Sequence, residues 1–276
     1  MTDHVKVKLD DGFELNINKA GQGPNLIIQH GWTGSTTDWK PIIDELSQHF
    51  TCYYWDVRTY YQENVTIDRL ATDVQNLIDQ EGLTDITLVG HSMGALISWE
   101  YINLFSCDNL RLLVIIDQTP KIITDNSWQL GLYHNYPHED NVIFEQNLED
   151  NFHHAVIDLI LNGQEMSDEE RELIRKSNFM EDRTERLKDF NPKAWTDTWK
   201  SLSRKDFREV LKTISVPVYL AYGDKSNFYG IDIANYVKEN TPNAMLHIYP
   251  GSGHHPHMDY KDDFVAKVVE YAELDS

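Results

Sequence analysis

Ser92 lies between two glycines in the segment Gly-His-Ser-Met-Gly at residues 90–94. An apolar run at residues 86–89 precedes this segment and another at residues 95–102 follows it, which predicts a strand, a tight turn and a helix. The glycines allow the backbones to approach closely at the turn, where a larger side chain would clash. The N–H of Met93, in the first turn of the helix, is predicted to face the serine hydroxyl and to stabilise a developing oxyanion. The segment therefore predicts an exposed, nucleophilic serine.

Buried strands and amphipathic helices alternate along most of the chain, and these elements must position the serine. The apolar patterns predict strands at residues 5–9, 13–17, 25–29, 52–55, 86–89, 112–116, 216–222 and 245–249, and helices at residues 37–50, 66–80, 95–102, 232–240 and 260–273. Such alternation indicates an α/β fold with a mostly parallel sheet that helices cover on both faces.

Residues 121–210 interrupt this alternation. They are acidic and helical in pattern, without a convincing strand, so we expect them to form a helical lid inserted between strands six and seven. The core then consists of residues 1–120 and 211–276. A lid in this position covers the carboxyl ends of the strands, where open α/β sheets bind ligands. Its aromatic residues are interpreted mainly as lid core, with at least one lining an apolar substrate pocket: Trp128, Tyr133, Tyr136, Trp195 and Trp199.

Composition limits the partners of the chain. The formal net charge of −21 over 276 residues makes nucleic acid and anionic membranes poor partners. There is no apolar run of about 18 residues, and the two cysteines, Cys52 and Cys107, do not suggest a disulfide framework. We therefore expect a soluble cytoplasmic protein that acts on a small molecule with an apolar portion. The sequence does not indicate an oligomeric state.

No metal or organic cofactor is expected. The sequence His-His-Pro-His at residues 254–257 resembles a metal-binding run, but it contains Pro256 and has no second ligand cluster to complete a site. The glycines at residues 90–94 serve the turn rather than a phosphate.

The chain resembles the α/β-hydrolase fold superfamily over nearly its whole length. Three segments carry the resemblance, in the order and spacing of that superfamily: His-Gly-Trp at residues 30–32, the serine segment at residues 90–94, and Gly-Ser-Gly-His at residues 251–254. The resemblance implies that His254 is the general base for Ser92. It also implies that the backbone N–H of Trp32 joins that of Met93 in the oxyanion hole. One departure is the loop after the fourth strand, Asp-Val-Arg-Thr-Tyr-Tyr at residues 56–61, which lacks the glycines that many members have there.

The third member of the triad has two candidates. Members usually carry an aspartate after the seventh strand, but Ser226 occupies that position and Asp224 lies two residues before it. Asp117 closes the apolar strand at residues 112–116, as in some subfamilies, and a buried carboxylate there would be costly unless it is paired. We therefore expect Asp117 to orient His254 and keep Asp224 as the alternative.

The expected activity is hydrolysis of a small ester, lactone or amide through an acyl-enzyme. A first alternative is a cofactor-independent dioxygenase of a 3-hydroxy-4-oxoquinoline, a class that also resembles this chain and uses its histidine–aspartate pair as a base. Members of that class tend to have histidine directly after the serine, where this chain has Met93. A second alternative is a lidded ligand sensor with little turnover.

Overall fold

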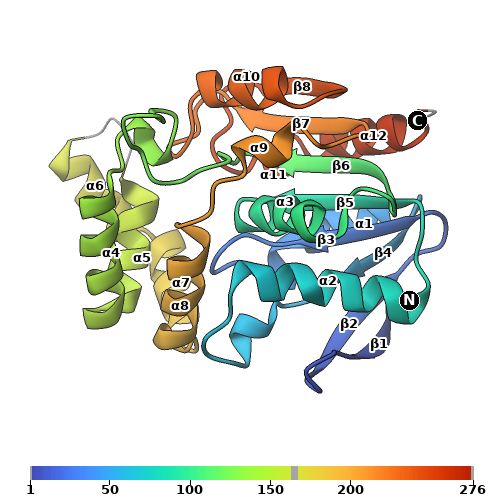
Figure 1. Ribbon diagram of the computed structural model, residues 1–276. Helices are drawn as coiled ribbons and strands as arrows, with labels where there is room; N and C mark the ends of the chain where they lie inside the picture. The colour runs from blue at the N-terminus through green and yellow to red at the C-terminus, as the bar shows by residue number, and fades with distance from the viewer. Residues whose placement is uncertain (1, 163–166, 275–276) are drawn as a thin grey trace.

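The computed structural model describes residues 2–162 and 167–274. Its centre is an eight-stranded sheet in the order β1-β2-β4-β3-β5-β6-β7-β8 (Figure 1). The strands are β1 (Thr2–Lys8), β2 (Glu14–Ala20), β3 (Asn25–Gln29), β4 (Thr51–Tyr54), β5 (Ile86–His91), β6 (Leu110–Ile116), β7 (Val218–Gly223) and β8 (Ala244–Tyr249). β1 and β2 are antiparallel, and β3 to β8 run parallel, which confirms the predicted mostly parallel sheet.

Helices cover both faces of the sheet because alternate residues of each buried strand point to opposite sides. In β6, Leu113 and Ile115 belong to one hydrophobic cluster, and Val114 and Ile116 belong to the other. The first cluster includes α2 (Ile67–Glu81), α3 (Met93–Phe105) and α10 (Ile231–Asn240), and the second includes α1 (Lys40–Leu46) and α12 (Lys261–Ala272). The short helices of the core are η1 (Thr36–Trp39), η2 (Arg58–Tyr60) and α11 (Pro256–Asp259). Two more short helices, η3 (Leu132–His134) and α9 (Arg208–Leu211), lie between β6 and β7.

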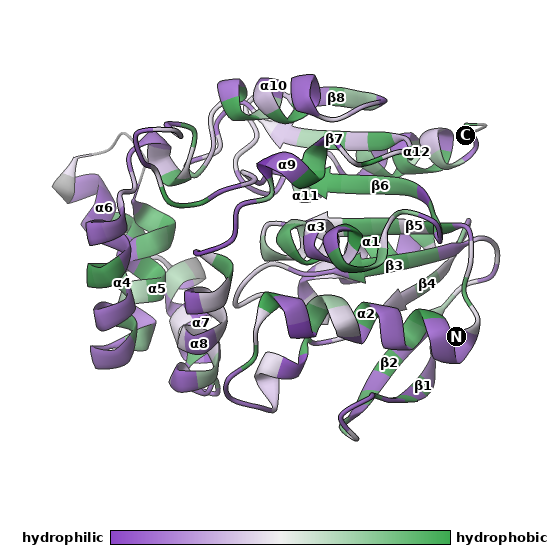
Figure 2. Cartoon of the chain, viewed as in Figure 1, coloured by the Kyte–Doolittle hydropathy of each residue, from purple (hydrophilic) through white to green (hydrophobic). Residues whose placement is uncertain are grey.

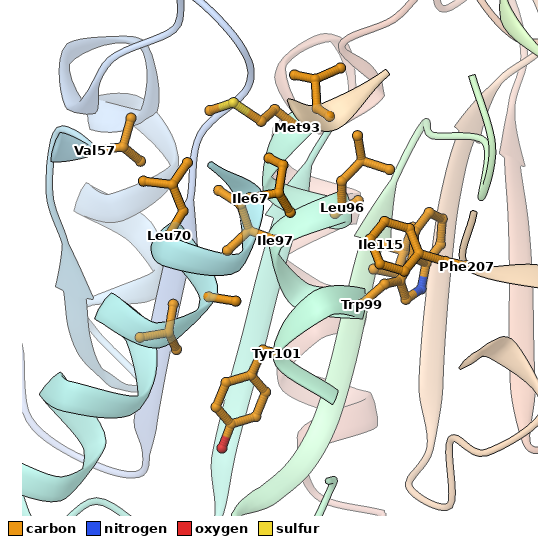
Figure 3. Close-up of a cluster of buried hydrophobic side chains, with 14 of the residues drawn as sticks. Val57, Ile67, Leu70, Met93, Leu96, Ile97, Trp99, Tyr101, Ile115 and Phe207 are labelled. Carbon is orange, nitrogen blue, oxygen red and sulfur yellow. The ribbon is translucent and has the colours of Figure 1, made fainter. Parts of the chain in front are cut away.

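Helix α3, which follows Ser92, is held rigidly in the core. Its residues from Met93 to Ile102 are all buried, as expected for a helix that is apolar on every side. Figure 3 shows Trp99 of this helix beside Ile115 of β6 and Phe207, and the Trp99 and Phe207 ring centroids lie 6.1 Å apart. The packing therefore fixes the turn that presents the serine.

Between β6 and β7 the chain forms a helical segment at one end of the sheet (Figure 1). Its helices are α4 (His138–Asp150), α5 (Phe152–Leu161), α6 (Asp168–Arg175), α7 (Asn178–Leu187) and α8 (Pro192–Leu202). The described residues of this segment contain isolated bridges but no strand of the central sheet. In Figure 2 polar residues cover much of α4 and α6, whereas β6 is apolar. We call this segment the lid; its role in substrate choice stays a prediction.

Two local features of the structure differ from what the sequence pattern predicts. The helix predicted at residues 37–50 is divided into η1 and α1 and ends at Leu46. The loop at residues 56–61, which lacks the expected glycines, is anchored by the buried Arg58, whose Nη2 lies 2.6 Å from Oδ1 of Asp73. This ion pair holds the loop in its conformation, although the loop lacks the glycines. Across residues 2–162 and 167–274, none of the helices is long and apolar enough to cross a membrane.

Candidate active site

Ser92 occupies the sharp turn that its flanking glycines predict. Its backbone angles, φ 54° and ψ −119°, lie in a region that L-residues rarely adopt. A Cβ atom on Gly94 would lie 2.1 Å from the carbonyl oxygen of Gln29, and one on Gly90 would lie 2.3 Å from that of Gly94. Neither position accepts a side chain. The strain and the close packing together hold the serine at the end of β5, where it lines a cavity.

His254 and Asp117 are directly hydrogen-bonded, with 2.6 Å between Nδ1 of His254 and Oδ2 of Asp117. Because a carboxylate can only accept this bond, Nδ1 carries the proton, and in the neutral imidazole Nε2 then keeps its lone pair. This is the tautomer that a general base for a serine hydroxyl requires. Ser92 and His254 line the same cavity.

Asp117 is fully buried and is held by groups at the end of β7 and on the loop that follows it. Its Oδ2 accepts a hydrogen bond of 2.6 Å from Oγ of Ser226, and its Oδ1 accepts one of 3.4 Å from the N–H of Gly223. Ser226, which stands where relatives usually place the acid, thus supports an acid supplied by the neighbouring strand. The sequence suggested no role for Ser226, although its position in the motif was a signal that could have been used.

Asp224, the alternative acid, lies elsewhere. Its Oδ1 accepts a hydrogen bond of 2.6 Å from the N–H of Gly251, at the start of the loop that carries His254. Among the described residues it forms no hydrogen bond or ion pair with the imidazole of His254, which bonds to Asp117. Asp224 therefore helps to shape the histidine loop.

The predicted oxyanion donors lie on the two segments that approach Ser92. Met93 is the first residue of α3, and N–H groups in the first turn of a helix have no partner within it. Gly31 packs so closely that a Cβ atom there would lie 3.3 Å from Cβ of Ser92, and Trp32 follows it directly. Trp32 also anchors the loop to the lid through a hydrogen bond of 3.0 Å from its Nε1 to the carbonyl of Trp195.

Three further histidines lie near the hydrogen-bonded pair of His254 and Asp117. The ring of His91 lies 4.7 Å from those of His254 and His257 and 4.8 Å from that of His255, centroid to centroid. Nε2 of His91 donates a hydrogen bond of 2.8 Å to the carbonyl of His254, which fixes the loop. No group of metal-ligating residues with metal-site geometry is found in the described part of the chain. The rings of His254, His255 and His257 pack against His91, which directly precedes Ser92.

Burial disfavours the charged form of His30, His91 and His257, and this predicts how stability depends on pH. Burial lowers the pKa of His30, and it lowers the pKa values of His91 and His257 well below 6.5. Below about pH 6.5 the unfolded chain takes up protons that the folded chain does not. Each histidine should therefore reduce the free energy of unfolding by up to about 1.4 kcal/mol per pH unit.

Denaturant midpoints measured from about pH 7.5 to about pH 5.5 should fall as the pH falls. His257→Leu removes one titrating group and should make this slope shallower, whatever its effect on stability at neutral pH. A midpoint that does not change over this range would contradict the assignment, as would an unchanged slope in the variant.

The cavity above Ser92 has a volume of about 850 Å³ and is enclosed by both core and lid. Of the lid aromatics singled out in the sequence, Trp199 lines it, and its ring lies 5.0 Å from that of Trp32. From the loop after β7, two aromatic residues that the sequence did not suggest also line it, Phe228 and Tyr229, and the Phe228 ring lies 4.5 Å from that of His254. They follow Ser226 on the loop after β7, and no periodic pattern marks them.

Comparison with known proteins agrees with this arrangement. Residues 24–260 match the family model for the alpha/beta hydrolase fold. A pimeloyl-[acyl-carrier protein] methyl ester esterase of Pseudoalteromonas atlantica is 26% identical over 266 residues, which cover 93% of this chain and 97% of that protein.

Solved structures are similar over the whole length of the chain. An esterase from Exiguobacterium antarcticum has a TM-score of 0.82 at 18% identity, and a bromoperoxidase from Bacillus anthracis has a TM-score of 0.82 at 19% identity. In both cases 99% of this chain and 100% of the other are covered. At these identities the likeness concerns the fold. Together with the family match and the nucleophile turn at the end of β5, it shows that this chain belongs to the α/β hydrolase fold family.

Proposed function

We propose that this protein hydrolyses small carboxylic esters with an apolar portion, and related lactones or amides, through an acyl-enzyme on Ser92. One observation carries the proposal. A strained serine and a histidine whose Nδ1 is bonded to a buried aspartate line the same cavity. This is the arrangement in which a serine hydroxyl becomes a nucleophile near neutral pH.

The geometry supports the following sequence of steps. Nε2 of His254 takes the proton of Ser92 as Oγ attacks the carbonyl carbon of the ester. The N–H groups of Met93 and Trp32 stabilise the oxyanion, while Asp117 stabilises the imidazolium. The imidazolium then protonates the departing alcohol, and the carbon–oxygen bond of the ester breaks. Water, activated by the same imidazole, releases the acid and restores Ser92.

The cavity favours a substrate with an apolar part. Val156, Leu159 and Ile160 of α5 line it, together with Leu132. The relative from Pseudoalteromonas atlantica is named as a methyl ester esterase, which supports an ester of an acyl chain as the substrate class. The finer substrate choice depends on the lid.

We also propose a cytoplasmic location and a small molecule as the only partner needed for activity. Cys52 and Cys107 are free and buried, which fits a reducing compartment. The net charge of −21 disfavours nucleic acids and anionic surfaces.

A panel of p-nitrophenyl esters from acetate to octanoate tests the proposal. We expect hydrolysis without any added metal or organic cofactor, and unchanged rates after treatment with EDTA, because the proposed chemistry uses only side chains and backbone N–H groups. Activity that is lost with the chelator and restored by zinc would contradict this. Oxygen-dependent cleavage of a 3-hydroxy-4-oxoquinoline without ester hydrolysis would favour the dioxygenase alternative, and tight ligand binding without turnover would favour a sensor.

A further inference from the structure

Arg183 of α7 lines the catalytic cavity, and no carboxylate in the described part of the chain pairs with it. Its only hydrogen bond among the described residues runs from Nη2 to Oγ1 of Thr33, at 2.9 Å. The structure records no ion pair for this guanidinium within residues 2–162 and 167–274, and its Nε is buried there without a hydrogen-bond partner. A guanidinium has five N–H donors, so most of the capacity of Arg183 is unused.

Asp38, a carboxylate whose charge acts on Arg183, already has other partners. Asp38 accepts a hydrogen bond of 2.6 Å at Oδ1 from Nη1 of Arg186, and one of 2.8 Å at Oδ2 from the N–H of Ser35. Burial, together with the positive charge of Arg186, lowers the pKa of Arg183. An arginine nevertheless stays protonated at neutral pH, so its charge is unbalanced where it stands.

Arg183 lies beside the loop that is expected to bind the oxyanion. Thr33 directly follows Trp32, is buried, and has a φ of 57°, a conformation that a β-branched residue rarely adopts. The hydrogen bond from Arg183 reaches the side chain of this strained residue. The unused donors of Arg183 are therefore close to the residues that surround the reacting carbonyl.

The charge of the cavity wall differs from that of the protein. Its charged side chains are the cations Arg183, Arg186 and Lys225 and the anions Asp38 and Asp182. This wall is positive by one charge, in a chain whose net charge is −21. A low-dielectric cleft with a positive wall concentrates anionic ligands.

We propose that the cavity takes esters that carry a second, anionic group, a carboxylate or a phosphate, and that Arg183 binds that group. Planar guanidinium groups pair with the oxygens of either anion through two parallel N–H···O bonds. The apolar side chains of α5 then contact the spacer between the anion and the ester. The kinetic test of this inference rests on the proposed ester hydrolysis. The inference narrows the substrates of that reaction to esters with an anionic group.

The kinetic test compares matched anionic and neutral esters. The carboxylate pairs are monomethyl and dimethyl esters of the dicarboxylic acids from succinate to suberate. The phosphate pair is a butyryl ester of glycerol 3-phosphate and the same ester of glycerol. The readout is the ratio of kcat/KM for the anionic ester to that for the neutral ester, and the pair with the larger ratio identifies the anion.

Arg183→Gln should lower this ratio about 30-fold, mainly through KM, because one charge-assisted pairing is lost. Arg183→Lys should recover part of it. The control is Arg204→Gln, which removes an exposed lid arginine paired with Glu145 outside the cavity and should change the ratio less than about twofold. An equal ratio in the wild type and in Arg183→Gln would overturn the proposal.

A binding measurement tests the anion site independently of the proposed ester hydrolysis. Calorimetry with monomethyl adipate on Ser92→Ala should show binding that weakens about 30-fold when Arg183→Gln is added. If no ester is hydrolysed but this difference appears, the activity assignment fails and the anion site stands. If esters are hydrolysed but both variants bind monomethyl adipate equally, the anion site fails and the activity assignment stands.

Discussion

Ser92→Ala is expected to lower kcat for ester hydrolysis by roughly 10⁴- to 10⁶-fold, because it removes the proposed nucleophile and leaves only the oxyanion donors and the binding cavity. The variant should fold normally, since alanine is compatible with the close packing around the turn. Substrate binding should persist. Steady-state kinetics on the best p-nitrophenyl ester, with protein concentration high enough to detect the residual rate, measures the effect.

Ser98→Ala is the matched control for this prediction. Ser98 lies nearly two turns further along, in α3, and its hydroxyl donates to the carbonyl of Gly94 at 2.9 Å. Its loss should change kcat by less than about fivefold. Burial raises the pKa of Cys52 to about 12, so this thiol does not compete as a nucleophile. A Ser92→Ala variant that keeps most of its esterase activity would contradict the mechanism.

Asp117→Asn is expected to lower kcat by about four orders of magnitude, by analogy with the acid of serine-protease triads. An amide at this position no longer stabilises the imidazolium. It can also present its NH₂ group to Nδ1 of His254 and so favour the wrong tautomer. The neutral side chain keeps the volume of aspartate, so the loss should appear in kcat while thermal stability changes much less.

Asp224→Asn provides the comparison, because the two aspartates were the competing acids. Asparagine can still accept the hydrogen bond from Gly251 that Asp224 accepts, so the loop of His254 should keep its position. We expect a loss of less than about tenfold. An inactive Asp224→Asn beside an active Asp117→Asn would mean that Asp224 is the acid in the working enzyme.

The nucleophile turn could be predicted because its determinants are local. The apolar run before residue 90, the glycines and the apolar helix after residue 94 are contiguous, and each has a direct steric reason. The parallel sheet followed from the same kind of evidence, since buried strands and helices alternate with a regular pattern. Periodicity and turn chemistry were therefore sufficient to predict the class of fold.

The position of Asp117 could be predicted, but the groups that hydrogen-bond its carboxylate could not all be predicted. A carboxylate at the end of the apolar strand suggested Asp117, because such a group is costly to bury without a partner. The bond from Ser226 joins residues that are 109 positions apart. Contacts of this kind depend on how two strands align, and no spacing within the sequence indicates them.

The residues that line the substrate cavity were the hardest to predict from the sequence. The lid aromatics were noticed, but which of them face the cavity depends on how each lid helix is rotated against the core. Arg183 is one of several arginines of the lid. Unlike Arg175, Arg186 and Arg204, it has no ion pair with a carboxylate among the described residues. Its hydrogen bond to Thr33 spans 150 positions. Helical periodicity carries no information about such a pairing.

Peptide mapping after reaction with a fluorophosphonate tests the central claim, that Ser92 is the covalent nucleophile, most directly. The account predicts a single phosphonyl group per chain, on the peptide that contains Ser92. It also predicts that esterase activity is lost in proportion to labelling, with no labelling of Ser92→Ala. A label on another residue with Ser92 unmodified, or full activity in an enzyme labelled at Ser92, would contradict it.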